Sequence, residues 1–292
     1  MKMKALTGLS IAALATGVVS VQAQNLNGTL NTGFYGAPLA VQTINTGFGN
    51  AAGGNDSAGG SELDAAYGAI SGGNLYLFLA GNFENNGNHL NLFIDGGAVG
   101  ESTLSTSGGS MAAMNGSVFS SGFQATFAYD MNNYAGVLYN ENYNLVGGSQ
   151  VSGGYIGSLA ETSTGIAAGG YGGAATLYLN NNHASTMGTA GAALSGATSG
   201  ANTTTGLEFV VPLSAIGYTG GNIEVLADIN GGGDTYLSNQ LLPGQPVGTG
   251  NLGNGGVLSN PGYFTLVVPE PTTLALAGLG GLATLVAARR RK

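Results

Sequence analysis

Basic side chains are missing from almost the whole of this sequence. The six Lys and Arg residues stand at its two ends, as Lys2, Lys4, Arg289, Arg290, Arg291 and Lys292. All fourteen acidic residues lie between Ala5 and Ala288. Because nucleic-acid binding depends on cationic groups that neutralise phosphates, this distribution excludes nucleic acid as a partner. The interior of the chain also cannot form a Lys or Arg salt bridge.

Cysteine and tryptophan are absent as well. The lack of cysteine excludes disulfides, thiolate nucleophiles and Cys-type zinc sites. Charged residues make up only 7% of the chain, against about 25% in typical soluble domains. Glycine is instead abundant, at 55 of 292 residues, and there are 13 Tyr and 10 Phe. Since disordered chains are poor in aromatics, this composition indicates a folded domain with long Gly- and Asn-rich loops.

The N-terminus has the three parts of a secretory signal peptide. Lys2 and Lys4 supply the basic start, and residues 6–19 form an apolar run. Val21-Gln22-Ala23 places acceptable residues at the two positions that signal peptidase reads. We therefore expect residues 1–23 to form a signal helix that is cleaved after Ala23. A permanent membrane anchor is the alternative, although the apolar stretch is short for one.

The C-terminus, residues 269–292, reads as a membrane-directed signal. Pro269-Glu270-Pro271 is followed by the uncharged segment 272–288 and then by the basic tail Arg289, Arg290, Arg291 and Lys292. The segment has 17 residues, the lower limit of the roughly 17–25 that span a membrane as a helix. The positive-inside rule would keep the basic tail in the cytoplasm.

These three parts, in this order at the end of the chain, resemble the PEP-CTERM sorting domain. The resemblance implies that Pro269, Glu270 and Pro271 are a recognition motif and that the helix is a transient inner-membrane anchor. It also implies removal of the tail by exosortase, a membrane transpeptidase-like enzyme of Gram-negative bacteria that make exopolysaccharide. An ordinary anchor that is never processed is the alternative.

Between the two signals, the sequence predicts an all-β fold. Apolar residues alternate with period two in several short segments, which is typical of strands. The clearest cover residues 74–81, 89–95, 123–129, 207–211, 223–229 and 263–268. Gly- and Asn-rich turns separate them. We expect about nine to eleven strands in a single β-sandwich or jelly-roll-like domain over residues 24–268, with one helical turn at 212–216 and a surface loop at 188–205.

A second resemblance concerns this central domain. The segments 62–67, 74–79, 92–95 and 206–214 are similar in order and pattern to the family 9 carbohydrate-binding module and its relatives. The resemblance implies a β-sandwich that binds glycan. Because tryptophan is absent, sugar rings would have to stack on tyrosines, for which packing within a sheet is the alternative interpretation. The candidates are Tyr129, Tyr134, Tyr139, Tyr143, Tyr155, Tyr171 and Tyr178.

One segment has the composition of a calcium loop. Asp228, Asn230 and Asp234 offer carboxylate and amide oxygens around a flexible run of three glycines, and hard cations prefer such oxygen ligands. The chain has no Lys or Arg nearby to compete for the carboxylates. A solvated Asn/Gly/Asp turn without any ion is the alternative.

Catalytic signals are weak. His89 and His183 each lie beside asparagine-rich sequence and are interpreted as surface histidines near turns. The carboxylate pairs Glu62/Asp64 and Asp228/Asp234 are close in sequence, as a glycosidase would need, but strand edges and turns explain them as well. We therefore expect no enzymatic activity and no cofactor other than the possible calcium ion.

The sequence as a whole predicts an exported protein that signal peptidase and exosortase process. We expect a transient inner-membrane intermediate, then a non-enzymatic cell-surface or extracellular-matrix protein associated with exopolysaccharide. A carbohydrate-binding module for extracellular glycan is the first alternative, and a glycan-degrading enzyme is the second.

Overall fold

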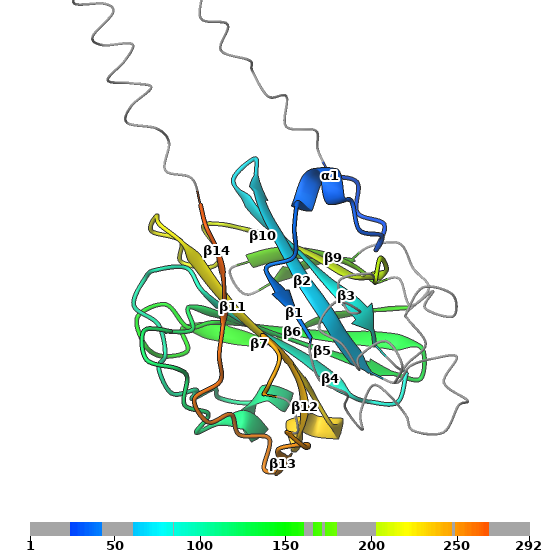
Figure 1. The fold of residues 1–292 in the computed structure, drawn as a ribbon. Coiled ribbons are helices and arrows are strands. Elements are labelled where there is room, and N and C mark those ends of the chain that lie inside the picture. The colour runs from blue at the N-terminus through cyan, green and yellow to red at the C-terminus, as the bar shows by residue number, and fades with distance from the viewer. Residues whose placement is uncertain are drawn as a thin grey trace, which may run out of the picture.

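Two antiparallel sheets face each other across a hydrophobic core in the computed structural model of this chain (Figure 1). The structure describes residues 24–42, 61–83, 85–160, 166–170, 173–179, 203–246 and 249–268. Within these ranges, every pairing between named strands is antiparallel. The predicted all-β architecture is therefore confirmed for this part of the chain. The expected signal helix and the expected C-terminal helix lie outside it.

The smaller sheet contains six strands. Their spatial order is β1 (Ala40–Val41), β2 (Glu62–Ser71), β3 (Asn74–Asn82), β10 (Gly206–Pro212), β9 (Gly173–Leu179) and β8 (Ile166–Gly170). A short helix, α1 (Thr32–Tyr35), packs on the outer face of this sheet against Tyr67 and Phe78.

The larger sheet contains eight strands. Their order is β13 (Gly253–Asn254), β12 (Tyr236–Leu242), β11 (Ile223–Asn230), β4 (His89–Asp95), β5 (Phe127–Tyr134), β6 (Val137–Asn144) and β7 (Ser152–Ala160), and β14 (Phe264–Leu266) also pairs with β11. The two 3-10 helices η1 (Ser110–Met114) and η4 (Gly232–Asp234) contact each other at one end of this sheet (Figure 1).

The alternation of apolar residues correctly predicted the positions of most of the central strands. The predicted strands at 74–81, 89–95, 207–211 and 223–229 correspond to β3, β4, β10 and β11, and the structure shifts their ends by at most one residue. The described residues form fourteen strands, more than the nine to eleven expected, and two of them, β1 and β13, contain only two residues each. Such short pairings leave no periodic signal in a sequence.

Two local predictions were wrong. The strand expected at 123–129 begins only at Phe127, because Phe123 leaves the sheet and packs against Phe119 and Tyr263. The helical turn expected at 212–216 is a hydrogen-bonded turn, in which the Ala215 amide donates to the Pro212 carbonyl oxygen at 2.9 Å. Of the loop expected at 188–205, only residues 203–205 are described.

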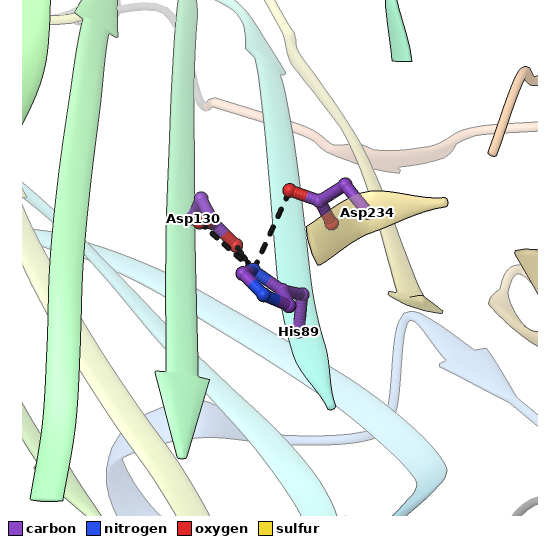
Figure 2. A group of neighbouring side chains, drawn as sticks. All are labelled: His89, Asp130 and Asp234. Atoms are coloured by element: carbon purple, nitrogen blue, oxygen red, sulfur yellow. Dashed lines mark hydrogen bonds and ion pairs between the residues drawn. The ribbon is translucent and has the colours of Figure 1, made fainter. Parts of the chain in front are cut away.

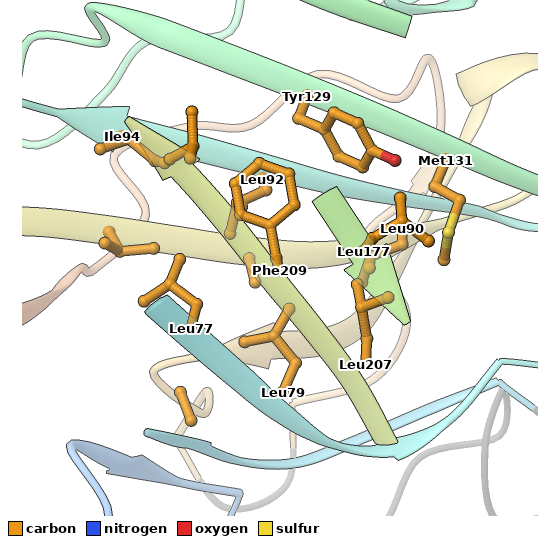
Figure 3. Packing of buried hydrophobic residues seen from close by; sticks show 14 of the residues in the cluster. Leu77, Leu79, Leu90, Leu92, Ile94, Tyr129, Met131, Leu177, Leu207 and Phe209 are labelled. Carbon is orange, nitrogen blue, oxygen red and sulfur yellow. The ribbon is translucent and has the colours of Figure 1, made fainter. Parts of the chain in front are cut away.

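The main core lies between the two sheets (Figure 3). Leu77, Leu79, Leu207 and Phe209 of the smaller sheet face Leu90, Leu92, Ile94 and Tyr129 of the larger one. The rings of Phe209 and Tyr129 are 4.9 Å apart. This core explains why β3, β4 and β10 alternate so regularly, since every second side chain must be apolar to fill the space between the sheets.

The outer face of the larger sheet is also covered. Residues 99–123, which contain η1, and residues 253–263 form a cap over it, and Leu104, Met111, Met114, Phe119 and Leu258 of the cap pack on Phe93 and Ala128 of the sheet. Polar residues on this face of β4, β5 and β11 therefore do not all face solvent, although alternation alone suggests that they should.

Phe209 offers a test of this packing. Its side chain is fully buried between the sheets, so Phe209→Ala should lower the free energy of unfolding by about 3–5 kcal/mol. Val210→Ala, on the opposite and partly exposed face of the same strand, should cost only about 1 kcal/mol. Urea unfolding midpoints of both variants measure the difference. Equal losses would contradict the assigned orientation of β10.

Candidate functional site

A row of polar side chains crosses the larger sheet on the face that lies under the cap. Asp228 of β11 pairs with Asn91 of β4, Asn91 pairs with Asp130 of β5, and Asp130 pairs with Glu141 of β6. Residues directly opposite one another on antiparallel strands share a face of the sheet. Leu90 and Leu92, the neighbours of Asn91, point the other way into the main core.

Asp234 joins this row from the short helix η4, which lies over the end of the sheet (Figure 2). Its backbone is left-handed, with φ of 56°, which Asp and Asn tolerate better than most residues. Gly256 of the cap packs directly on it, since a Cβ atom at that position would lie 1.9 Å from the Asp234 carbonyl oxygen. The cap therefore holds Asp234 over the sheet.

His89 lies between the two aspartates that approach from opposite sides (Figure 2). Its Nδ1 atom is 2.9 Å from Asp130 Oδ1 and 3.4 Å from Asp234 Oδ2. Its other nitrogen, Nε2, lies 2.9 Å from the side-chain amide nitrogen of Asn132, which also donates to the Gly87 carbonyl oxygen. Because Nε2 accepts that hydrogen bond, the network assigns the ring proton to Nδ1, which donates it to Asp130.

We call His89, Asn91, Asp130, Asp228 and Asp234 the acidic cluster. None of the five residues is more than 3% exposed. Burial raises the pKa of the Asp130, Asp228 and Asp234 carboxyls well above the ordinary value, and the negative charges of neighbouring carboxylates raise these pKa values further. Burial also lowers the pKa of His89, against the attraction of Asp234 and Glu141.

Several oxygens of the acidic cluster have no hydrogen-bond donor. These are both carboxylate oxygens of Asp228, both of Asp234, and the Asn91 side-chain oxygen. Glu141, at the edge of the row, has hydrogen-bond donors, because the Ser110 amide and the Tyr143 hydroxyl both donate to its Oε2 atom. Chemically, the cluster is a buried group of carboxylate and amide oxygens that could hold a metal ion, and ligand atoms of His89, Asp130 and Asp234 lie within 4.8 Å of one another.

The structure changes the predicted calcium loop. It brings Asp228 and Asp234 close enough to interact electrostatically, as the prediction requires. The side-chain oxygen of Asn230, however, accepts a hydrogen bond from the Gly231 amide at 3.1 Å within the loop itself. Strand pairing instead places Asn91 and Asp130 beside Asp228 on the same face of the sheet.

Sequence reasoning missed Asp130 and Asn91 and misplaced His89. The interpretation of His89 as a surface histidine is wrong, because the side chain is buried and contacts two aspartates. A signal was available, since β4, β5 and β11 each carry polar residues on the face opposite the main core. Only the cap, which no periodicity predicts, converts this face from a solvated surface into a closed site. His183 lies outside the described residues.

The second carboxylate pair is separate from the acidic cluster. Glu62 and Asp64 are buried in β2, at a bulge where Gly81 approaches the backbone of Glu62. Asp64 accepts a hydrogen bond of 2.6 Å from the Thr203 hydroxyl, and burial raises its pKa. Glu62 is the first residue of β2 and Asp64 the third, so the pair lies at the end of a strand, as interpreted from the sequence, although the structure buries both.

The structure buries some of the tyrosines predicted to bind sugar and exposes others. Tyr129 and Tyr143 are buried, Tyr178 is partly buried, and Tyr171 lies outside the described residues. Tyr134, Tyr139 and Tyr155 are exposed, at 60%, 40% and 54%. They belong to β5, β6 and β7 and share the face that carries the acidic cluster, because Tyr139 pairs with Asn132 and Tyr155 pairs with Glu141. We call these three residues the tyrosine face.

Both ends of the described chain are tied into the sandwich. Gln24, the first residue after the predicted cleavage position, donates to Glu208 of β10 at 2.8 Å, and the Asn27 and Gly28 amides donate to the same carboxylate. At the other end, β14 closes the larger sheet against β11 and ends at Leu266. The remaining C-terminal sequence, residues 267–292, matches the PEP-CTERM protein-sorting motif.

This chain carries a PEP-CTERM sorting motif. The match supports an exported surface protein that is sorted by exosortase, as the C-terminal residues predicted. The match includes Pro269, Glu270, Pro271 and the basic tail, which lie outside the described residues. The predicted cleavage position, Ala23, also lies outside the described residues. The motif covers the end of the chain only and says nothing about the sandwich.

No curated protein and no solved structure matches the chain. The resemblance of the central domain to family 9 carbohydrate-binding modules is accordingly unsupported. Among the described residues, no helix is long and apolar enough to cross a membrane.

The raised pKa values of the acidic cluster predict how the PEP-CTERM protein responds to pH in the presence of a chelator. Asp130, Asp228 and Asp234 bind protons more tightly in the folded protein than in the unfolded chain. Their contribution to stability is therefore complete below the unfolded pKa, about 4, and is lost as pH rises through the folded pKa. The melting temperature in EDTA should fall between pH 5 and pH 8.

His89 opposes this trend only at the acidic end. Its lowered pKa favours folding less as pH falls below about 6.5, its ordinary value. Between pH 6.5 and pH 8 the carboxyls alone determine the slope, and Asp228→Asn should make it shallower. A melting temperature that rises over this interval in EDTA would contradict the electrostatic description of the cluster.

Proposed function

We propose that this protein is a non-enzymatic component of the bacterial surface or extracellular matrix, associated with exopolysaccharide. The observation that carries the proposal is the PEP-CTERM motif at residues 267–292, which begins directly after the last strand of the sandwich.

The chemistry of the sandwich favours a structural role over catalysis. The carboxylates that could act as acid and base, Asp228 and Asp234, are both fully buried under the cap. A glycosidase needs its two carboxyl groups beside the scissile bond of a bound sugar, and a polymeric substrate would not reach these side chains without displacing the cap.

The sorting tail can be tested by deleting residues 269–292 and following the product in the producing cells. We expect the full-length protein to appear at the surface or in the matrix with a mass that lacks the tail. The deletion variant should instead be released into the medium. A double substitution, Pro269→Ala with Pro271→Ala, should leave the protein in the membrane fraction with Lys292 still present.

Pro246→Ala provides the matched control, because Pro246 lies in an exposed loop outside the motif. This variant should be processed like the unchanged protein, as judged by mass spectrometry of the C-terminus. A mature protein that still ends in Lys292, or a deletion variant that is distributed like the unchanged protein, would refute sorting through this tail.

A second candidate function, glycan binding, is favoured by the tyrosine face. Three exposed rings on adjacent strands of one sheet form a surface on which sugar rings could stack, and exposed aromatics of this kind commonly mark interaction sites. The same face continues into the polar row of the larger sheet, where hydroxyl and amide groups could bind sugar hydroxyls.

Tyr155→Ala and Tyr139→Ala test this function by retention of the exported protein on the exopolysaccharide of the producing strain. Burying about 50 Å² of each ring contributes about 1 kcal/mol, so each substitution should weaken binding about fivefold. Tyr155→Phe, which keeps the ring, should bind nearly as the unchanged protein does. Lack of retention of the unchanged protein would exclude glycan binding, and release of soluble sugar during the incubation would contradict a non-enzymatic role.

A further inference from the structure

The acidic cluster contains more buried acceptors than the protein can satisfy. Asp228 and Asp234 together present four carboxylate oxygens without a hydrogen-bond donor, and Asn91 adds an amide oxygen. Buried polar atoms are almost always paired in folded proteins. A group of five unpaired oxygens beneath one cap therefore indicates a ligand that accepts electron pairs.

No Lys or Arg side chain of the folded region can act as that ligand, since these residues occur only at positions 2, 4 and 289–292. Two side-chain N–H groups within the cluster both donate to Asp130. His89 Nδ1 lies 2.9 Å and 3.1 Å from its two oxygens, and Asn91 Nδ2 donates to Oδ1 at 3.2 Å. Asp228 lies on the far side of Asn91 from Asp130 in the sheet, so the His89 proton does not serve it.

We propose that the acidic cluster binds a calcium ion at Asp130 and Asp234, whose ligand atoms lie within 4.8 Å of each other and of a His89 ring nitrogen, with the unpaired oxygens of Asn91 and Asp228 beside them. The ion would neutralise the carboxylates that the sheet brings together and would occupy the oxygens that have no donor. It would also connect β4, β5 and β11 to η4 and so fasten the cap to the sheet. The site does not depend on the sorting tail or on the tyrosine face.

The donor set identifies calcium among the common divalent cations. Calcium takes six to eight oxygen ligands in flexible arrangements, and these side chains offer carboxylate and amide oxygens. Magnesium usually keeps several bound waters, for which a site in which no residue is more than 3% exposed has little room. Zinc prefers nitrogen and sulfur ligands, but the His89 nitrogen that faces the cluster carries a proton and donates it to Asp130.

His89 is a positioning residue in this arrangement. Asn132 fixes the ring through Nε2, and the ring orients the Asp130 carboxylate through Nδ1. Such hydrogen bonds to metal-binding carboxylates set the direction of their remaining lone pairs. Loss of the ring should therefore weaken calcium binding without removing a ligand.

The test is a calcium titration of the exported protein after treatment with EDTA. We expect about one calcium ion per chain by elemental analysis after dialysis, and an increase in melting temperature of about 5–10 °C when calcium is present at a hundredfold excess over its dissociation constant. Asp228→Asn and Asp234→Asn should abolish this increase. Both are expected to fold, since Asn keeps the shape of Asp and tolerates the left-handed backbone at residue 234.

Glu224→Gln is the matched control. Glu224 lies on β11, four residues before Asp228 and on the same face, and pairs with Asp95 outside the cluster. The Glu224→Gln substitution removes one negative charge, as Asp228→Asn does, and should leave the calcium response unchanged. His89→Gln should reduce the affinity while keeping one ion per chain at saturation.

Three results would overturn the proposal. The first is an EDTA-treated protein whose melting temperature and metal content do not respond to calcium. The second is a calcium response that survives Asp228→Asn, or that Glu224→Gln removes equally. The third is stabilisation by zinc or magnesium at concentrations where calcium has no effect.

Discussion

The folded part of this protein has no cationic side chain with which to stabilise a buried carboxylate, and much of its architecture follows from that constraint. Several carboxylates are buried nonetheless. Removing an ionised carboxylate from water costs several kcal/mol unless donors or charges replace the water. The structure uses backbone amides, hydroxyl groups and a single histidine for this purpose, and the distribution of these donors determines which segments pack against which.

Glu208 shows how backbone amides take the place of a salt bridge. Its two oxygens receive the Asn27 and Gly28 amides, the Tyr35 hydroxyl and the Gln24 side chain. All of these donors come from the segment that directly follows the predicted signal peptide. The carboxylate is therefore satisfied only when this segment lies on β10, which links the start of the mature chain to the middle of the smaller sheet. The Asp95 carboxylate likewise accepts hydrogen bonds from the backbone amides of Gly97 and Gln124. Against these well-served carboxylates, the unpaired oxygens of Asp228 and Asp234 stand out as a different kind of site.

The sequence predicted the features that follow from the two-residue alternation of strands. It missed the features that depend on which segments cover a face of the sheet. β3, β4, β10 and β11 were located nearly to the residue because the space between the two sheets requires an apolar side chain at every second position. Asp228 and Asp234 of the predicted calcium loop are close in sequence, whereas Asn91 and Asp130 join them only through strand pairing, and calcium binding stays a prediction. His89 was misplaced because its exposure is decided by η4 and the cap, which are irregular segments without a periodic signal. The β5 boundary was wrong on the same account, because Phe123 packs into the cap and leaves the sheet.

The two ends of the described chain and the acidic cluster lie at opposite ends of the sandwich. In Figure 1, α1 and the end of β14 lie at one end of the sandwich, whereas η1 and η4 lie at the other. The sorting motif begins directly after β14, so any attachment made through it acts at the first end. The cap and the acidic cluster then face away from the point of attachment. A chain whose polar interactions rely on amides and hydroxyls has few strong contacts to hold irregular loops at that distal end, and it is there that the carboxylates of β5, β11 and η4 come together with the Asn91 amide of β4.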